Sequence, residues 1–375
     1  MIPISIRSAD DCQLQTGIKD HFFYYFCLPQ IFSRMIIRAK APLRLGLAGG
    51  GSDVSPFSDI YGGAVLNATI SMHAFASIKT RDDGKIIIHA FDRDEKYEFE
   101  KTDHLELNGE LNLIKGIYNR IVTEFSHEPL SFELSTYVDA PPGSGLGTSS
   151  TLVVAILGAF VEWLNLPLGE YDIAQLAYDI ERVDLQMAGG KQDQYTATFG
   201  GVNFMEFFKE GKVIVNPLRI RAHILSELAY NLVLFHTEIS RESSNIIEIQ
   251  SQNVMKNDKQ AIEATLKLKE QAIMMKEAIL KGELNKIGDI LDFGWQNKKL
   301  MAQGISNAYL DEIYDTAIKN GASGGKISGA GGGGFMTFYC PDNSRQKVIN
   351  ALKKYGGDVK RYEFTQSGLT SWSYR

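Results

Sequence analysis

A glycine- and proline-rich segment that leads directly into a strongly apolar helix constrains this chain most. Residues 139–147 contain two prolines and three glycines, and a continuous helical pattern of apolar residues starts at Thr148. Glycines let the backbone of such a loop approach a ligand closely, and the first N–H groups of a helix, at its positive dipole end, favour an anion. The residues of this segment alone fit a phosphate-binding loop and a turn before a capped core helix equally well.

This segment lacks the lysine of the common nucleotide-binding loop. The pattern G-x-x-x-x-G-K-[ST] is absent, and the most similar stretch, residues 321–326, has the wrong spacing and is followed by Ile327. The hydroxyls of Thr148, Ser149 and Ser150 are suited to capping the helix or to contacting a phosphate-bound Mg²⁺. A nucleotide held here would therefore be held without a P-loop lysine.

The composition bounds the class of protein. The chain has 375 residues, 44% of them hydrophobic and 22% charged, which is typical of a globular protein with two domains. A net charge of −6 argues against nucleic acid or an anionic membrane surface as the main partner. The sequence contains no run of 18 or more apolar residues, so no membrane-spanning helix is predicted. The three cysteines are far apart, which fits a reducing cytoplasm better than a disulfide framework or a zinc site.

The element pattern predicts the domain organisation. Strands are expected at 36–47, 64–79, 85–91 and 131–138, and a helix at 111–125, before the glycine-rich loop. Strands first, then loop and helix, favour an α+β domain over a dinucleotide-binding unit. We expect an N-terminal domain at 35–215 and a C-terminal domain at 216–375, with long helices at 246–255, 260–280 and 283–303 and a last strand at 358–365. Residues 1–34 are expected to be a disordered or non-native extension, with a partner-binding arm as the alternative.

A second glycine turn follows the first predicted strand. Gly49, Gly50 and Gly51 precede Asp53, whose carboxylate could accept hydrogen bonds from sugar hydroxyls. An ordinary turn with an aspartate cap explains this stretch equally well.

Two acids flank one predicted helix end. Residues 171–186 have helical spacing with Glu181 at the flank of the apolar face, and residues 188–195 read as a loop with Asp193 in its middle. One helix end and one turn separate the two carboxylates, so they could converge on a single ligand. A solvated glutamate and a turn aspartate are the alternative.

A third glycine cluster occupies residues 321–334. It contains a G-x-G-x-x-G match from Gly329 to Gly334, but a strand is expected to follow it instead of a helix. The dinucleotide-binding interpretation therefore fails in this context.

Taken together and in this order, the three glycine segments resemble the motifs of the GHMP small-molecule kinases. Residues 39–53 are similar to the first motif of that family, residues 141–150 to its phosphate-binding motif, and residues 325–334 to its third motif. The resemblance implies two domains, an N-terminal one of the ribosomal-S5 domain 2 type and a C-terminal ferredoxin-like one, with the active site between them. It also implies ATP and Mg²⁺ as cofactors.

Within the family, residues 47–53 are more similar to the sugar kinases that act on fucose and on heptose 7-phosphate than to galactokinase. Residues 62–70 look most like the bacterial D-glycero-D-manno-heptose 7-phosphate kinases. The resemblance implies phosphorylation of the anomeric hydroxyl of that sugar phosphate to the 1,7-bisphosphate, for nucleotide-activated heptose synthesis. Another sugar-1-kinase, such as an L-fucokinase, and a non-catalytic ligand-binding member are the alternatives.

The resemblance also assigns roles to residues. Asp193 matches the catalytic aspartate of the family and Glu181 its Mg²⁺-binding glutamate, with the hydroxyl of Ser149 favoured over that of Ser150 as a second metal ligand. Arg44 matches an arginine near the reacting hydroxyl. The expected ATP-binding residues are Pro141, Pro142, Gly143, Ser144, Gly145, Leu146, Gly147, Thr148, Ser149 and Ser150. The expected substrate-binding residues are Arg44, Gly50, Gly51, Asp53, Gly190, Lys191 and Asp193, and the supporting loop is Gly329, Gly331, Gly332 and Gly333.

A phosphorylated acceptor needs a basic side chain to bind its phosphate. Lys191, beside Asp193, is the first candidate, followed by Lys40, Lys79, Arg81, Arg182 and Lys115, and the sequence does not rank them. The expected partners are thus ATP and a small sugar or sugar phosphate, without nucleic acid or membrane, in a monomer or a homodimer.

Overall fold

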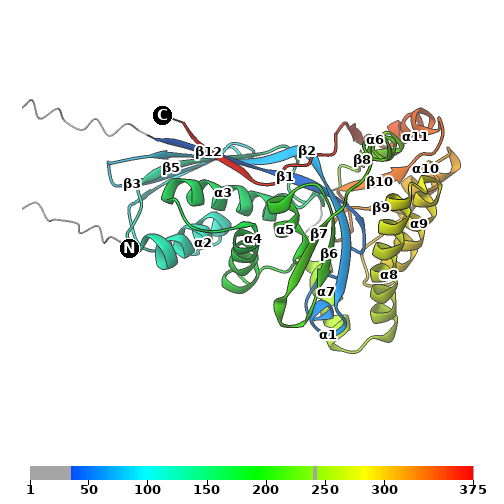
Figure 1. Ribbon diagram of the computed structural model, residues 1–375, viewed down its shortest axis with the longest axis horizontal. Coiled ribbons are helices and arrows are strands. Elements are labelled where there is room, and N and C mark those ends of the chain that lie inside the picture. Colours follow the sequence, from blue (N-terminus) through cyan, green and yellow to red (C-terminus); the bar gives the residue numbers. More distant parts are fainter. Residues whose placement is uncertain (1–34, 240–242, 375) are drawn as a thin grey trace, which may run out of the picture. The chain divides into compact units, whose positions relative to one another are not determined.

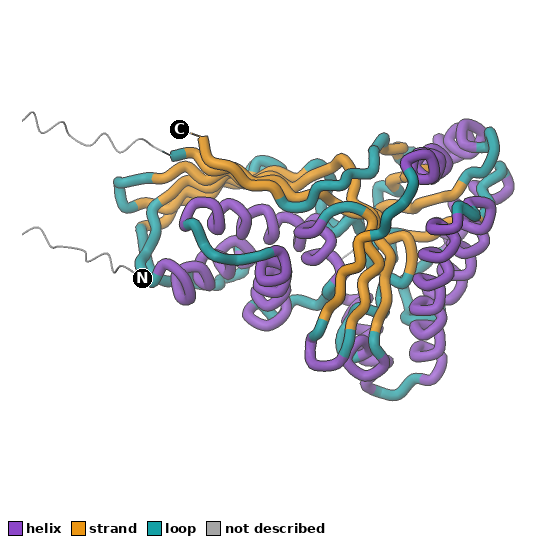
Figure 2. The backbone as a smooth tube through the Cα atoms, viewed as in Figure 1, coloured by secondary structure: helices purple, strands orange, loops and turns teal. Residues whose placement is uncertain are grey.

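Two β-sheets organise the chain in a computed structural model that describes residues 35–239 and 243–374 (Figures 1 and 2). The predicted extension, residues 1–34, lies outside the described residues. The first sheet has eight strands in the order β12-β1-β2-β5-β3-β4, and β6 and β7 continue it from the other end of β2. Its strands are β1 (Ile36–Ala48), β2 (Gly63–Thr80), β3 (Lys85–Ala90), β4 (Glu95–Glu100), β5 (Phe132–Val138), β6 (Val202–Phe207), β7 (Val213–Pro217) and β12 (Thr370–Tyr374).

Helices cover one face of this sheet, below the strands in Figure 1. They are α2 (Asn112–Ile121), α3 (Thr148–Leu164), α4 (Glu170–Asp179) and α5 (Gln192–Phe199), and the short α1 (Phe57–Tyr61) follows the second glycine turn. The predicted apolar helix α3 packs on β1 and β2, and Val153, Ile156 and Leu157 are fully buried. This burial fixes the N-terminus of α3 and the loop before it relative to the sheet.

The second sheet has four antiparallel strands in the order β11-β8-β10-β9. They are β8 (Leu232–His236), β9 (Gly324–Ile327), β10 (Phe335–Tyr339) and β11 (Asp358–Lys360). Helices α8 (Lys259–Lys281), α9 (Ile287–Lys298) and α10 (Ala308–Lys319) run on one side of it (Figure 1). The remaining helices are α6 (Ala222–Asn231), α7 (Ser243–Met255) and α11 (Arg345–Leu352). Buried apolar residues of α8, among them Ala272 and Met275, belong to the same core cluster as β1 and β2.

Several elements differ from the sequence prediction. The segment 188–195 was predicted as a loop, but α5 begins within it at Gln192. The last predicted strand ends at Lys360, and β12 begins ten residues later. Strands β4, β6 and β7 and helix α6 were not predicted. The exposed residues of β4 are charged and its others only half-buried, which hides the hydrophobic alternation of a strand.

Two smaller findings concern composition. None of the helices in the described ranges is long and apolar enough to span a membrane. Cys340 is a buried free thiol, and the other two cysteines, Cys12 and Cys27, lie outside the described residues.

Candidate active site

The glycine-rich loop and the third glycine cluster pack directly against each other. Gly145 has φ +78°, and a Cβ there would lie 2.5 Å from the carbonyl oxygen of Ser328. A Cβ on Gly334 would lie equally close, at 2.5 Å, to the carbonyl oxygen of Ser144. The same carbonyl oxygen accepts a 3.0 Å hydrogen bond from the N–H of Phe335. Only glycine tolerates both the positive φ and the close approach, so each loop fixes the shape of the other.

A cavity of about 500 Å³ opens beside these loops, at the N-terminus of α3. The residues that line it come from both halves of the chain, and three of them belong to α7. The lining residues are Arg44, Gly51, Asp53, Val54, Pro142, Gly143, Gly145, Gly147, Thr148, Ser149, Ser150, Glu181, Arg182, Met187, Ala188, Gly189, Gly190, Gln192, Asp193, Ser244, Ile247, Gln250, Lys298, Gly329 and Ala330. The three glycine segments and the two acids thus meet around one cavity.

Glu181 lies in a turn of π-helix, Ile180–Asp184, directly after α4, and its side chain is buried. Ser149 Oγ donates to Glu181 Oε1 at 3.4 Å, and Gln194 Nε2 donates to Oε2 at 2.5 Å. The guanidinium of Arg182 lies 3.8 Å from Glu181 Oε1. This burial excludes the interpretation of Glu181 as a solvated surface residue.

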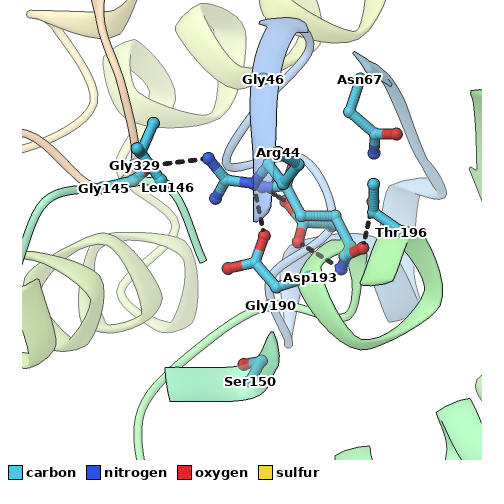
Figure 3. A network of polar contacts seen from close by, with 12 residues as sticks. Arg44, Gly46, Asn67, Gly145, Leu146, Ser150, Gly190, Asp193, Thr196 and Gly329 are labelled. Carbon is cyan, nitrogen blue, oxygen red and sulfur yellow. Dashed lines mark hydrogen bonds and ion pairs between the residues drawn. The ribbon is translucent and has the colours of Figure 1, made fainter. Parts of the chain in front are cut away.

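Asp193 lies in the first turn of α5, beside Gly147 of the glycine-rich loop. Arg44 Nε donates to Asp193 Oδ1 at 2.7 Å, while Arg44 Nη1 donates to the carbonyl oxygen of Gly145 at 2.6 Å (Figure 3). One buried guanidinium on β1 therefore joins the acid to the glycine-rich loop, and charge-assisted hydrogen bonds of this kind are strong and directional.

Asp53 is 1% exposed and accepts two backbone hydrogen bonds, from the N–H groups of Gly51 and Gln192, each at 3.1 Å. A Cβ on Gly190 would lie 1.9 Å from Asp53 Oδ2, so this carboxylate packs against bare backbone. Burial, and secondarily the charge of Asp193, raise the pKa of Asp53 above its ordinary value. Hydroxyl donors from a ligand would relieve this desolvation.

Some predicted residues lie outside the cavity lining in the described part of the chain: Pro141, Ser144, Leu146, Gly50, Lys191, Gly331, Gly332 and Gly333. Lys191 Nζ is instead 3.2 Å from Asp59 Oδ1 and lies over the ring of Tyr178. Lys115 Nζ donates to Asn108 Oδ1. Of the six basic candidates for the acceptor's phosphate, Arg182 is the one in the lining.

The sequence prediction missed Lys298, Gln192 and the α7 residues of the lining. Lys298 ends α9, where a lysine followed by another lysine is typical of a solvated surface. Gln192 and Gln194 lie at the start of α5, within the segment 188–195 that was predicted as a loop. The sequence therefore did not indicate their positions beside Asp53 and Glu181. No motif marked any of them.

The side chains at Ser149 and Glu181 fit a hard divalent cation. A carboxylate and a hydroxyl beside the glycine-rich loop supply oxygen ligands, and Mg²⁺ usually takes its other ligands from phosphates and water. Among residues 35–239 and 243–374, no group of three or more His, Cys, Asp and Glu side chains could hold a metal by itself. These two residues would thus hold the ion together with a nucleotide.

Comparison with known proteins assigns the chain to a family. The model of the GHMP kinases N terminal domain matches residues 112–201, and that of the GHMP kinases C terminal domain matches residues 275–358. A Campylobacter jejuni protein named D-glycero-alpha-D-manno-heptose 7-phosphate kinase is 50% identical over 336 residues, covering 90% of this chain and 98% of its own. This chain belongs to the GHMP kinases. The family, and the α+β GHMP kinase fold expected from the motifs, are confirmed.

Two further relatives are a heptose kinase of known structure and a more distant fucokinase. The crystal structure of a D-glycero-D-manno-heptose 1-phosphate kinase from Bacteroides thetaiotaomicron is 46% identical, with a TM-score of 0.77 and coverage of 90% of this chain and 98% of that one. The Arabidopsis thaliana bifunctional fucokinase/GDP-fucose pyrophosphorylase is 27% identical over 370 residues, covering 94% of this chain and 34% of that protein. The fucokinases are thus more distant GHMP kinases.

Proposed function

We propose that this GHMP kinase transfers the γ-phosphoryl group of ATP to the anomeric hydroxyl of D-glycero-D-manno-heptose 7-phosphate. The product is the 1,7-bisphosphate, a precursor suited to nucleotide-activated heptose synthesis. The observation that carries the proposal is the bridge of Arg44 between Asp193 and the phosphate loop, inside one cavity. The heptose kinase identity of the 50% identical relative supports the choice of acceptor.

In this proposal, the phosphate loop binds the nucleotide. The N–H groups of Gly143 to Ser150 and the dipole at the N-terminus of α3 hold the phosphates of ATP. Glu181 and Ser149 would hold Mg²⁺, which would supply positive charge against the nucleotide phosphates. Neither contribution needs a P-loop lysine in the loop itself.

The acceptor lies between Asp53 and Asp193. Asp53 and the backbone at Gly51 and Gly190 orient the sugar hydroxyls, and Asp193 accepts the proton of the attacking hydroxyl. Arg44 holds the Asp193 carboxylate in place and stabilises the negative charge that develops on the transferred group. Positioning and electrostatics supply most of the acceleration in phosphoryl transfer.

The test is a coupled ADP-release assay across a sugar panel. The panel contains D-glycero-D-manno-heptose 7-phosphate, the corresponding 1-phosphate, the free heptose, L-fucose and D-galactose. The 1-phosphate is included because the two heptose kinase relatives are named for different phosphate positions. We expect ADP release with the 7-phosphate, and a ³¹P NMR signal of a new anomeric phosphate in the product.

Other outcomes contradict the proposal. Activity on L-fucose without activity on the 7-phosphate would assign the chain to the fucokinases, which match it at 26–27% identity. No ADP release with any sugar would leave a ligand-binding protein of this fold.

A further inference from the structure

Two lysines are buried beside Arg44, and the roles described above use neither. Lys298, at the end of α9, is 4% exposed and lines the cavity, and Lys326, on β9, is 6% exposed. Lys298 Nζ donates to the carbonyl oxygen of Gly329 at 2.5 Å, and Lys326 Nζ donates to that of Gly46 at 2.6 Å. Within the described ranges, neither ammonium forms an ion pair with a carboxylate. A buried ammonium without a carboxylate partner is costly.

The charges around these lysines leave an excess of positive charge. Lys326 interacts with Lys298 and Arg44, and Lys298 interacts with Arg44 and Asp53. The second acid, Asp193, is already bound by Arg44. Burial, followed by the charge of Arg44, lowers the pKa of Lys298 to about 8, although Asp53 acts in the other direction. Burial, Lys298 and Arg44 lower the pKa of Lys326 well below its ordinary value. A bound anion would offset this excess.

The position of Lys298 indicates which anion it meets. Its acceptor, Gly329, packs so closely on the phosphate loop that a Cβ there would lie 2.7 Å from Gly145 Cα. Gly145 is also the residue whose carbonyl oxygen accepts from Arg44 Nη1. Figure 3 shows Gly329 beside the Gly145–Leu146 turn, with the guanidinium of Arg44 directed toward them. Lys298 is thus bonded to the residue that packs on Gly145, and Arg44 donates to Gly145 itself and to Asp193.

We propose that Lys298 binds the phosphoryl group in transfer and so supplies, from α9, the ammonium that the phosphate loop lacks. This inference rests on the proposed kinase function. In the step, the bond from the γ-phosphorus to the β,γ-bridging oxygen breaks, the bond to the acceptor oxygen forms, Asp193 takes the hydroxyl proton, and ADP leaves. Lys298 keeps its proton throughout and donates hydrogen bonds to the equatorial oxygens, over which the negative charge of the transferred group is spread.

A structural role for Lys298 is the competing explanation. A lysine in the last turn of a helix interacts favourably with the helix dipole, and its bond to Gly329 could serve only to fix the third glycine cluster. The two roles differ in their pH dependence and in whether kcat or the thermal stability responds. The test therefore needs both readouts.

The experiment compares Lys298→Met and Lys298→Arg with Lys299→Met in steady-state assays with ATP and heptose 7-phosphate. Lys299 is the matched control, because it is the adjacent lysine but is 31% exposed and lies 3.9 Å from Asp311 Oδ1. We expect Lys298→Met to lower kcat roughly a hundredfold, the scale for one transition-state donor, with the KM values of both substrates within about threefold. Lys299→Met is expected to stay within about twofold of the wild type.

The pH profile separates the two roles. The wild-type kcat/KM should fall as the pH rises through the Lys298 pKa of about 8, because the neutral amine no longer attracts the phosphoryl group. In Lys298→Arg this alkaline fall should be absent up to about pH 9.5, because an arginine stays charged. Tm measurements by differential scanning fluorimetry check that the variants are folded.

Three results would overturn the inference. The first is a near-normal kcat in folded Lys298→Met, and the second is a fall of kcat/KM at alkaline pH that persists in Lys298→Arg. The third is a change in Lys298→Met that is confined to a higher KM for heptose 7-phosphate, which would indicate that Lys298 binds the acceptor's own phosphate. An inactive wild type would instead contradict the proposed function, so the two failures are distinguishable.

Discussion

Three carboxylates of the candidate site have different surroundings, which suit different tasks. Asp193 is bound by a guanidinium, Asp53 is buried among backbone N–H groups with a raised pKa, and Glu181 is buried between an amide and a hydroxyl. The environment of an acid decides which protonation state it favours and what it binds. The resemblance to GHMP kinases predicted all three residues, whereas it could not predict Lys298. A lysine pair at a helix end carries no pattern that distinguishes a buried ammonium from a solvated one.

Asp193→Asn tests the proposed base at this scale. An amide keeps the size and one hydrogen bond of the carboxylate but cannot accept the hydroxyl proton, so kcat should fall on the order of a hundredfold or more. The affinity for ATP, measured by calorimetry, should change little, because the phosphate loop is intact. A folded variant with near-normal kcat would remove Asp193 from this role.

Gly190→Ala tests Asp53 without removing its charge. The new methyl group would lie 1.9 Å from Asp53 Oδ2, so the carboxylate must leave the position proposed to bind the sugar. Loss of one hydrogen bond to a charged group costs about 1.5–3 kcal/mol, which corresponds to a roughly 10- to 100-fold rise in the KM for the sugar phosphate. The KM for ATP should stay within about threefold of the wild type.

The control for this variant is Gly169→Ala. Gly169 precedes α4 with an ordinary φ of −87°, and a Cβ there meets its nearest atom at 3.5 Å. A rise in both KM values for Gly190→Ala would indicate that the whole site has shifted instead of Asp53 alone.

At the scale of elements, long regular patterns were predictable and short or charged ones were not. Helices α3 and α8 and strands β1 and β2 follow the apolar periodicity of their sequences closely. Helix α5 was not predicted, for two reasons. The segment before it, 188–191, contains two glycines, and the helix itself has polar, aromatic and β-branched residues of modest helix propensity. The loops of the site were predictable as loops, but their mutual packing depends on residues almost 200 positions apart.

Gly145→Ala tests that packing. The substitution combines an unfavourable φ of +78° with a Cβ 2.5 Å from the carbonyl oxygen of Ser328, so the phosphate loop must separate from the third glycine cluster. We expect the KM for ATP to rise roughly tenfold or more and Tm to fall. Titration with ATP and a thermal unfolding scan measure the two effects.

Gly84→Ala separates the strain from the contact. Gly84 has a similar φ of +73°, but nothing lies within 4 Å of its Cβ position. This variant should carry only the backbone cost of about 1–2 kcal/mol, with an unchanged KM for ATP. Equal effects of the two substitutions on the KM would show that the contact between the loops is unimportant.

At the scale of the molecule, the last strand of the described chain pairs with the first. Strand β12 pairs antiparallel with the start of β1, where Ile36 faces Tyr374 and Lys40 faces Thr370. Leu369, just before β12, packs on Gly158 of α3 so closely that a Cβ there would lie 2.5 Å from it. No local pattern could predict this return, because its partners lie about 200 to 340 residues away and β12 is mostly exposed and polar. The C-terminal residues therefore stabilise the sheet that carries Arg44.

Deletion of residues 369–375 tests this stabilisation. The deletion unpairs the edge of β1 and exposes the α3 surface under Leu369, so the free energy of unfolding should fall by about 2 kcal/mol or more, the lower end of the range for losing a leucine contact. The specific activity of the folded fraction should remain near that of the wild type, because residues 369–374 do not line the cavity. Urea unfolding followed by circular dichroism, with ADP release measured in parallel, gives both values.

Leu369→Ala is the milder variant should the truncated chain not fold. Tyr374→Ala is the control, because Tyr374 is 63% exposed, and its free energy of unfolding is expected to stay within about 0.5 kcal/mol of the wild type. A truncated protein with an unchanged urea midpoint would show that the sheet holds without its last strand.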